Sequence, residues 1–308
     1  MSRLLQTSRR EFMALTCFAS IGMTLRAQTN PGEGHPDPIL WLVERGRARV
    51  YLFGFADAKD RSWLTPKIEH AFDESQEIWF ETPGAAASSL TEAERKRQQE
   101  EDDRIVPELS HDNTRTLFDA LGPGLGDRTL RMANELAVPK EQIEHLRPWF
   151  AYFILNSAFQ RSVHREVSDF PDRTLGERAA AAKKIVHTEL ATPADTTRWF
   201  AGLPDEAQRE HMEDLLDYID DEKAGINQSD YSWITGHEDT HTLDRMRTKR
   251  PAMYKAFQLD RNIQWANRIA GFLATEKTYF IAIGRNHTVG PDSIPVCLER
   301  IGLKPKQV

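Results

Sequence analysis

Cysteine and long apolar runs are both scarce in this chain of 308 residues. It has two cysteines, Cys17 and Cys297, so at most one disulfide can form within it. Its N-terminal apolar run, Ala14 to Leu25, spans 12 residues, whereas a helix that crosses a bilayer stably needs about 20. No second apolar run reaches that length. These shortages exclude a scaffold held by several disulfides and a protein anchored by its own membrane-spanning helices.

Several functional signatures are missing as well. The sequence contains no Gly-x-Ser-x-Gly elbow, no phosphate-binding loop and no Gly-x-Gly-x-x-Gly dinucleotide fingerprint. Positive charge is also in the minority, with 40 basic against 47 acidic residues and a net charge of −7. An acidic surface repels nucleic acids and anionic lipids. We therefore expect no nucleic-acid partner.

The first 27 residues are typical of a bacterial signal peptide of the twin-arginine type. Arg9 and Arg10 directly precede Glu11, the apolar run follows, and Ala27 stands where cleavage is expected. We therefore expect export, with the mature protein in the periplasm or outside the cell. Because the apolar run is too short for a permanent anchor, we expect no stable membrane span after the signal is removed.

Removal of residues 1–27 changes the balance of the chain. The signal carries four arginines and one glutamate, so the net charge of −7 becomes −10. Cys297 is then the one remaining cysteine, and no intrachain disulfide is possible. Residues 28–38 are rich in proline and glycine and are expected to form a flexible tether. Residues 39–308 are expected to form a single domain.

Apolar and turn patterns predict an α/β fold. Apolar runs bounded by turn residues predict a β-hairpin from 39–43 and 50–53 and further strands at 77–81, 183–189 and 277–283. Helical spacing predicts helices at 65–75, 252–274 and 293–301 and a mainly helical middle from 107 to 220, with a solvated helix or mobile loop at 88–104. We therefore expect a central mixed β-sheet flanked by helices, with two weakly related halves and a large helical insertion between them.

The two halves resemble each other at the ends of their strands. In the first half a strand leads into Gly54-Phe55-Ala56-Asp57, and in the second a strand leads into Gly284-Arg285-Asn286-His287. Each half also has a companion strand that ends in a glutamate, Glu81 in one and Glu189 in the other. Ligands of α/β proteins usually bind at the edge where strands end at their carboxyl termini. We therefore expect these strand ends to open onto one such edge.

A series of segments spread along the mature chain resembles a known family. The segments are Trp41-Leu42-Val43, Tyr51-Leu52-Phe53-Gly54, Glu81, Leu146-Arg147-Pro148-Trp149, Thr188-Glu189, Trp233-Ile234-Thr235-Gly236, Arg261 to Ala266 and Gly284 to Gly290. In order and spacing they resemble the TraB/GumN family, which is related to the TIKI proteases and more distantly to the erythromycin-esterase-like and ChaN-like folds. The likeness covers nearly all of the mature chain.

The resemblance implies an active site at the expected sheet edge. The hallmark of the family is a pair of Gly-x-x-His motifs and a glutamate after the first, which in the TIKI branch are implicated in metal-dependent peptide hydrolysis. Here the second motif keeps His287, whereas the first has Asp57 in place of histidine. The resemblance implies catalytic roles for Glu81, His287, Arg261 and Asn262. It implies a metal site made of Asp57, Glu81 and His287.

The chemistry of these residues leaves alternatives open. Two carboxylates and one imidazole, with Glu189 as a further candidate, can hold Mn²⁺, Co²⁺ or Zn²⁺ and leave a position for water, whose pKa the metal lowers. Without a metal, His287 can act as a general base oriented by a carboxylate. Arg261 would face a substrate carboxylate or the developing oxyanion.

The leading prediction is therefore an exported hydrolase, in its finer form a metal-dependent peptidase, that acts on a peptide or a small molecule. The alternative is a binding or scaffold protein on the same fold, in which the change to Asp57 has ended catalysis.

Two other features invite a functional reading. The segment from His237 to His241 matches the His-Glu-x-x-His pattern of zinc proteases. A pattern this short recurs by chance and no third ligand is identifiable downstream, so we interpret it as the solvated start of a helix. Most of the tryptophans are flanked by apolar residues and are expected in the core; they are Trp41, Trp63, Trp79, Trp149, Trp199 and Trp265.

Overall fold

A computed structural model describes residues 35–163, 170–226, 232–238 and 240–308 of the chain. The predicted export signal and the first part of the predicted tether lie outside the described residues. Asp37, near the end of that tether, is joined to the domain: its N–H donates to the carbonyl of Ile234 at 2.7 Å, and its carboxylate pairs with Lys67. None of the described helices has the length and apolar character that a bilayer span requires.

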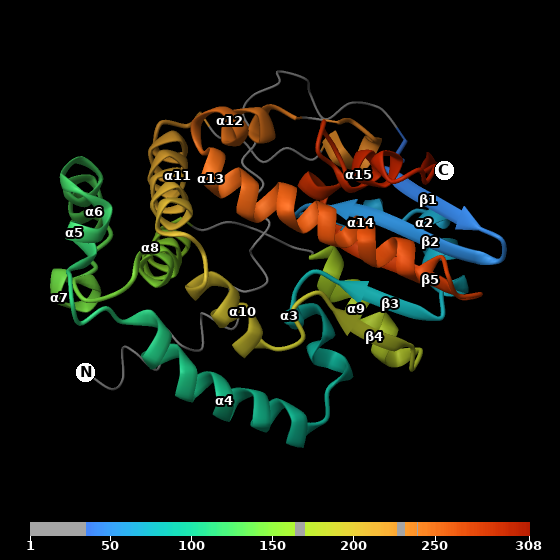
Figure 1. Cartoon of the computed structure of the whole chain (residues 1–308), viewed down its shortest axis with the longest axis horizontal. Coiled ribbons are helices and arrows are strands. Elements are labelled where there is room, and N and C mark those ends of the chain that lie inside the picture. Colours follow the sequence, from blue (N-terminus) through green and yellow to red (C-terminus); the bar gives the residue numbers. More distant parts are fainter. Residues whose placement is uncertain (1–34, 164–169, 227–231, 239) are drawn as a thin grey trace.

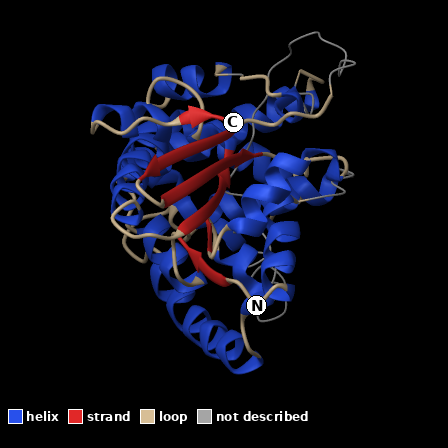
Figure 2. Ribbon diagram, turned by 90° about the vertical axis from the view of Figure 1, so that its right-hand side faces the viewer, coloured by secondary structure: helices blue, strands red, loops and turns tan. Residues whose placement is uncertain are grey.

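Six strands of the described chain form one mixed sheet, beside which a group of helices lies (Figure 1). The strands, in sheet order, are β4 (Ile185–Thr188), β3 (Glu77–Phe80), β5 (Thr278–Gly284), β2 (Ala48–Phe55), β1 (Leu40–Arg45) and β6 (Lys306–Gln307). The neighbours from β4 to β2 are parallel, whereas β1 is antiparallel to both β2 and β6. Figure 2 shows them as a single twisted sheet with helices on both sides. The mixed sheet expected from the sequence is confirmed.

The predicted hairpin is confirmed, and both of its strands are longer than expected. β1 and β2 pair from Leu40 against Phe53 to Arg45 against Ala48. The turn between them contains Gly46 with a φ of 61°, a left-handed conformation that glycine adopts without a Cβ clash. The hairpin thereby fixes the register of β2 against β1, while the other edge of β2 pairs with β5.

Helices cover both faces of the sheet. One face carries α2 (Pro66–Glu74) and α9 (Pro171–Ala181), and the other carries α14 (Asp260–Phe272) and α15 (Ile294–Arg300). On the first face Phe72 of α2 packs with Phe280 of β5. On the second face Trp265 of α14 and Cys297 of α15, a buried free thiol, share a cluster with Ile281 of β5. Successive residues of β5 thus point into opposite cores, as the pleat of a strand requires.

The helical insertion forms a lobe beside the sheet (Figure 1). It contains α4 (Glu92–Ser110), α5 (Leu117–Leu121), α6 (Pro123–Glu135), α7 (Lys140–Ile143), α8 (Pro148–Ser162), α10 (Pro193–Ala201), α11 (Asp205–Lys223) and α12 (His241–Lys249). The short helix α3 (Pro83–Ala86) precedes the lobe and packs on the sheet side, where Ala85 shares a core cluster with Phe72. Aromatic side chains such as Trp149, Phe153 and Phe200 fill the core of the lobe. Most of the polar segment 88–104 belongs to α4, so the helical alternative for this segment is confirmed.

The helix predicted over 252–274 is interrupted in the structure. α13 (Pro251–Tyr254) passes into a π-helical turn, η5 (Lys255–Leu259), and then into α14. A π turn inserts one residue, which rotates all following side chains by about 100° relative to an unbroken α-helix. Arg261 and Asn262 follow the turn directly, so their direction depends on it. Helical spacing in the sequence does not reveal such a local widening.

Helix α9 passes α3 in direct backbone contact. A Cβ built on Gly176 of α9 would lie 1.9 Å from the carbonyl oxygen of Ala85 in α3. The absence of a side chain at Gly176 therefore allows α9 to pack against the segment that follows β3.

We predict that Gly176→Ala lowers the free energy of unfolding by at least about 2 kcal/mol, because a backbone carbonyl cannot yield as the end of a flexible side chain does. Urea denaturation measures this change. Gly124→Ala in α6 is the matched control, since a Cβ there would meet nothing within 4 Å. Equal stabilities of the two variants would contradict the prediction.

Candidate active site

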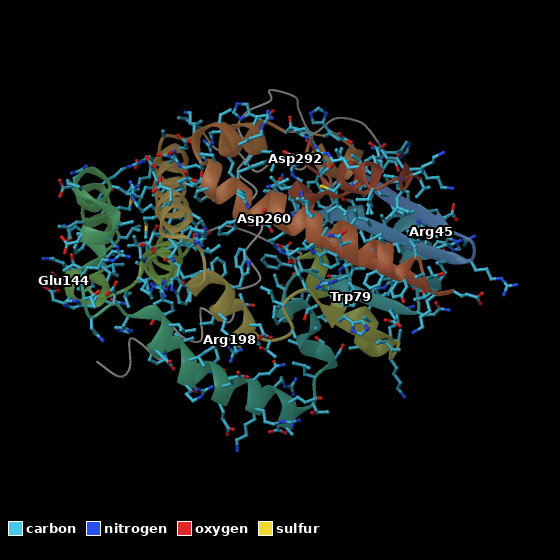
Figure 3. The ribbon with its side chains drawn as sticks, in the orientation of Figure 1. Arg45, Trp79, Glu144, Arg198, Asp260 and Asp292 are labelled. Atoms are coloured by element: carbon cyan, nitrogen blue, oxygen red, sulfur yellow. The ribbon has the colours of Figure 1, made fainter. Side chains whose placement is uncertain are left out.

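Four parallel strands end at the same edge of the sheet, and each is followed by a candidate residue. Asp57 follows β2, Glu81 follows β3, Glu189 follows β4, and His287 follows β5 within the 3-10 turn η6 (Arg285–His287). Helix α14 begins between the sheet and the helical lobe, at Asp260 (Figure 3). The expectation that these strand ends share one edge is confirmed.

Arg261 of α14 joins two of these strand ends through ion pairs. Its Nε donates to Glu189 Oε1 at 3.0 Å and its Nη2 donates to Glu189 Oε2, so the guanidinium grips that carboxylate with two hydrogen bonds. Its Nη1 donates to Glu81 Oε1 at 3.0 Å. The side chains of Arg261, Glu81 and Glu189 are 8 %, 5 % and 9 % exposed. Three charges therefore meet where water is largely excluded.

Glu81 stays ionised in spite of its burial. Burial alone would raise the pKa of Glu81, but the charge of Arg261 and the N–H of Gly284 hold this pKa well below its usual range. The Gly284 N–H donates to Glu81 Oε2 at 2.9 Å, so both carboxylate oxygens have donors. The two glutamates in turn raise the pKa of Arg261, although burial acts against them.

Asn262 holds His287 in one tautomer. The Asn262 Nδ2 donates to the backbone carbonyl of Asp292 at 2.7 Å. Since a carbonyl can only accept, Asn262 Oδ1 must be the atom that faces His287 Nδ1, at 2.6 Å. Nδ1 therefore carries the proton, and Nε2 of the neutral imidazole keeps its lone pair. This lone pair faces Arg261 Nη1 at 3.4 Å, and Glu81 Oε1 lies 3.7 Å from Nε2.

These contacts define one group, which we name the strand-end cluster: Glu81, Glu189, Arg261, Asn262 and His287. All four predicted catalytic residues belong to it, as does the further candidate carboxylate Glu189. The sequence favoured a carboxylate as the group that orients His287, whereas in the structure the amide of Asn262 makes that contact.

Two tryptophans that were expected only to fill the core also contact the cluster. Trp265 Nε1 donates to Glu189 Oε2 at 2.9 Å. The guanidinium carbon of Arg261 lies 5.6 Å from the centre of the Trp199 ring, a distance at which the ring face attracts a cation. Trp265 is one helical turn from Arg261, so sequence spacing could have indicated it. Trp199 comes from α10 of the lobe, and no local pattern connects it with the site.

The glycine of the first motif has a packing role. Gly54 pairs with Ile283 in the parallel register of β2 and β5, and a Cβ on it would lie 2.1 Å from Thr288 Oγ1. Thr288 directly follows His287, and its hydroxyl donates to the Arg285 carbonyl at 2.8 Å. Gly54 therefore leaves room for the turn that carries His287.

Asp57 follows β2 at the same edge of the sheet as the cluster and is only partly buried. Its backbone carbonyl accepts a hydrogen bond from Trp233 Nε1 at 3.2 Å.

The structure adds a carboxyl group that was not among the predicted site residues, Asp172 in the first turn of α9. Burial and the charges of Glu81 and Asp57 raise the pKa of Asp172 to about 6. An aspartate in the first turn of a helix is an ordinary pattern, so no local signal in the sequence indicates this environment.

The metal ligands that the resemblance implies do not fit a divalent cation while Arg261 stands between them. Arg261 Nη1 lies 3.0 Å from Glu81 Oε1 and 3.4 Å from His287 Nε2, so it already uses lone pairs of both groups. Within the described ranges, no group of three or more His, Cys, Asp or Glu side chains is placed to hold a metal ion. Asp57 therefore does not join Glu81 and His287 in a ready-made site.

The His-Glu-x-x-His segment does not lie on one helix. Helix α12 begins at His241, and His237 precedes it, so the two histidines do not share a helical face. Both are exposed, and Glu238 Oε1 accepts a hydrogen bond from Gln307 at 3.1 Å. The interpretation of this segment as the solvated start of a helix agrees with the structure.

Asp172 is expected to make stability depend on pH. Its pKa rises on folding from 3.8 to about 6, so its protonated form stabilises the folded state fully below pH ~4, and this contribution is lost as the pH rises through about 6. We predict that Asp172→Asn is more stable than the parent by up to about 3 kcal/mol above pH ~7 and equally stable below pH ~4. The amide keeps an acceptor for the Arg173 N–H, which donates to Asp172 Oδ1 at 2.8 Å.

Urea unfolding of both proteins between pH ~4 and ~8 measures this difference. Asp214, whose pKa burial also raises to about 6, is present in both proteins, so its contribution cancels. A difference in stability that stays constant over this pH range would contradict the assignment.

Comparison with known proteins identifies the family. The TraB/PrgY/gumN family matches residues 39–307. No curated protein and no solved structure matches the chain. The matched residues include the complete sheet, both strand-end motifs and all five residues of the strand-end cluster. Because the match covers most of its length, the chain belongs to the TraB/PrgY/gumN family.

Proposed function

We propose that the protein is a hydrolase whose general base is His287. The observation that carries the proposal is the fixed tautomer, in which Asn262 holds the proton on Nδ1 through a 2.6 Å hydrogen bond. Nε2 then presents its lone pair to the strand-end cluster, which is the arrangement that general-base catalysis requires. Family membership supports the proposal, because His287 completes the intact second motif.

The proposed reaction is the attack of water on a carbonyl carbon. The water first replaces the 3.4 Å contact between His287 Nε2 and Arg261 Nη1. Nε2 then takes a proton from the water while the water oxygen bonds to the carbon. The imidazolium then gives this proton to the leaving group as the bond between that group and the carbon breaks. The elements of water are thereby divided between the two products, and the imidazole returns to its starting state.

Arg261 is proposed to stabilise the negative charge that forms on the carbonyl oxygen. Its Nη1 lies 3.4 Å from His287 Nε2, so a carbonyl that the activated water attacks would lie near the guanidinium. Glu81 and Glu189 hold the guanidinium in place, which means that its charge need not reorganise during the reaction. Asp57 is partly exposed and marks the side from which a substrate would enter.

The proposed substrate is a peptide or a small carbonyl compound, and the proposed place of action lies outside the cytoplasm. The peptide rests on the resemblance to the TIKI proteases. The location rests on the Arg9-Arg10 pair and the short apolar run that follows it.

A binding or scaffold protein on the same fold is the second candidate. His287 is 3 % exposed and Arg261 is 7 % exposed, and the carboxylates of the cluster already accept hydrogen bonds from Arg261. A buried cluster whose charged groups are already paired can also hold α14 against the sheet without catalysing any reaction. The replacement of the first motif's histidine by Asp57 is consistent with this alternative.

We predict that His287→Gln lowers kcat by at least about 100-fold, because it removes the general base. The assay is hydrolysis of a panel of fluorogenic peptides and chromogenic esters by the mature protein. His70→Gln on α2, where the side chain is 76 % exposed, is the control and keeps parental activity. A parent that hydrolyses none of the panel would favour the scaffold, and an active His287→Gln variant would refute the role of the base.

We predict that Asn262→Ala lowers kcat by about 10-fold or more while KM changes little, because Nδ1 loses the acceptor that fixes the tautomer. Asn262 is a positioning residue, so the division between kcat and KM is the informative readout. An unchanged kcat in a folded variant would mean that the orientation of His287 does not matter for the reaction.

A further inference from the structure

The geometry points to Arg261 as the resident cation of this site: its guanidinium takes the place of a divalent metal, and the two are mutually exclusive occupants. The inference concerns the same site as the proposed hydrolase, but it depends on the contacts of the cluster and not on the reaction. It predicts a latent metal site that becomes available once the guanidinium is removed.

The positions of three atoms carry the inference. His287 Nε2 and Glu81 Oε1 lie 3.7 Å apart, which suits two ligands of one metal at bond lengths of about 2.1 Å. Arg261 Nη1 lies 3.0 Å from the oxygen and 3.4 Å from the nitrogen and is hydrogen-bonded to both. A metal bound along the same lone pairs would need the position that Nη1 now holds.

The remaining contacts of Arg261 keep it there. Glu189 binds Nε and Nη2, Trp265 Nε1 orients that carboxylate at 2.9 Å, and the Trp199 ring covers the guanidinium at 5.6 Å. A guanidinium cannot lose its charge in a protein, so it repels a divalent cation at every pH at which the fold persists. Displacement of Arg261 by a metal would leave this charge buried beside a second cation.

Removal of the guanidinium would leave a different set of groups. The carboxylates of Glu81 and Glu189 would have lost the cation that pairs with them, and the lone pair of His287 Nε2 would have lost its hydrogen-bond donor. Carboxylate oxygens and an imidazole nitrogen are donors that bind Zn²⁺, Mn²⁺ or Co²⁺. Glu81 and His287 already lie at a suitable distance, and Glu189 would have to move toward them, because the described side chains contain no ready group of three ligands. The charge that Arg261 supplied would then be supplied by the metal.

The test measures binding of Zn²⁺ and Mn²⁺ to the mature protein by equilibrium dialysis and elemental analysis. We expect neither the parent nor Arg261→Lys, which keeps the positive charge, to bind metal at His287, so that adding His287→Ala does not change their metal content. We expect Arg261→Ala to bind one equivalent per chain and to lose it when His287→Ala is added. Metal held by exposed histidines such as His237 and His241 survives that second substitution and is distinguished by it.

Two results would overturn the inference. One is a parent that binds an equivalent of metal and loses it in His287→Ala. The other is a folded Arg261→Ala that binds none. If Arg261→Ala does not fold, Arg261→Gln replaces it, and the measurement on the parent still decides the first point. Because the readout is metal content, a parent without hydrolase activity would refute the proposed function and leave this inference standing.

Discussion

The guanidinium of an arginine that is only 7 % exposed requires carboxylates beside it, because an unpaired buried charge costs several kcal/mol. In this protein they come from the ends of β3 and β4, parallel strands that are neighbours in the sheet, as Glu81 and Glu189. Arg261 reaches them from α14, and Trp199 of the helical lobe covers it. One ion-pair group therefore connects the sheet, the covering helix and the lobe, and it determines what His287 faces.

Stability alone does not account for this group. Replacement of a buried ion pair by apolar residues of similar volume is often neutral or stabilising, so three buried charges add little that a packed core would not supply. The histidine beside them is held in one tautomer by an amide whose own orientation is fixed by the Asp292 carbonyl. A tie between a helix and a sheet does not need a defined tautomer, whereas proton transfer does. This contrast favours catalysis over a scaffold role.

Much of the fold could be predicted from the sequence, because its signals are local. Apolar runs bounded by turn residues indicated β1, β2, β3, β4 and β5, and their carboxyl ends placed Glu81, Glu189 and His287 at one edge. The contacts that complete the site are not local. Trp199 reaches Arg261 only through the packing of the lobe. Asp172 acquires its raised pKa from burial and from the charges of Glu81 and Asp57, which come from other parts of the chain. The π turn that directs Arg261 has no counterpart in the apolar spacing of the sequence. The substitution of Arg261 for a metal likewise depends on side-chain distances that no motif encodes.

The proposed role of His287 requires that its Nε2 atom presents a lone pair to Arg261 and Glu81. Long-range ¹H–¹⁵N correlation spectra of the imidazole side chains test it most directly, with the His287 signals assigned by their absence from His287→Gln. We expect that, once the imidazole is neutral, the proton resides on Nδ1 and Nε2 has the ¹⁵N shift of an unprotonated nitrogen. A spectrum in which Nε2 carries the proton would mean that the Asn262 amide is turned the other way, and it would contradict both the proposed base and the hydrogen bond from Arg261.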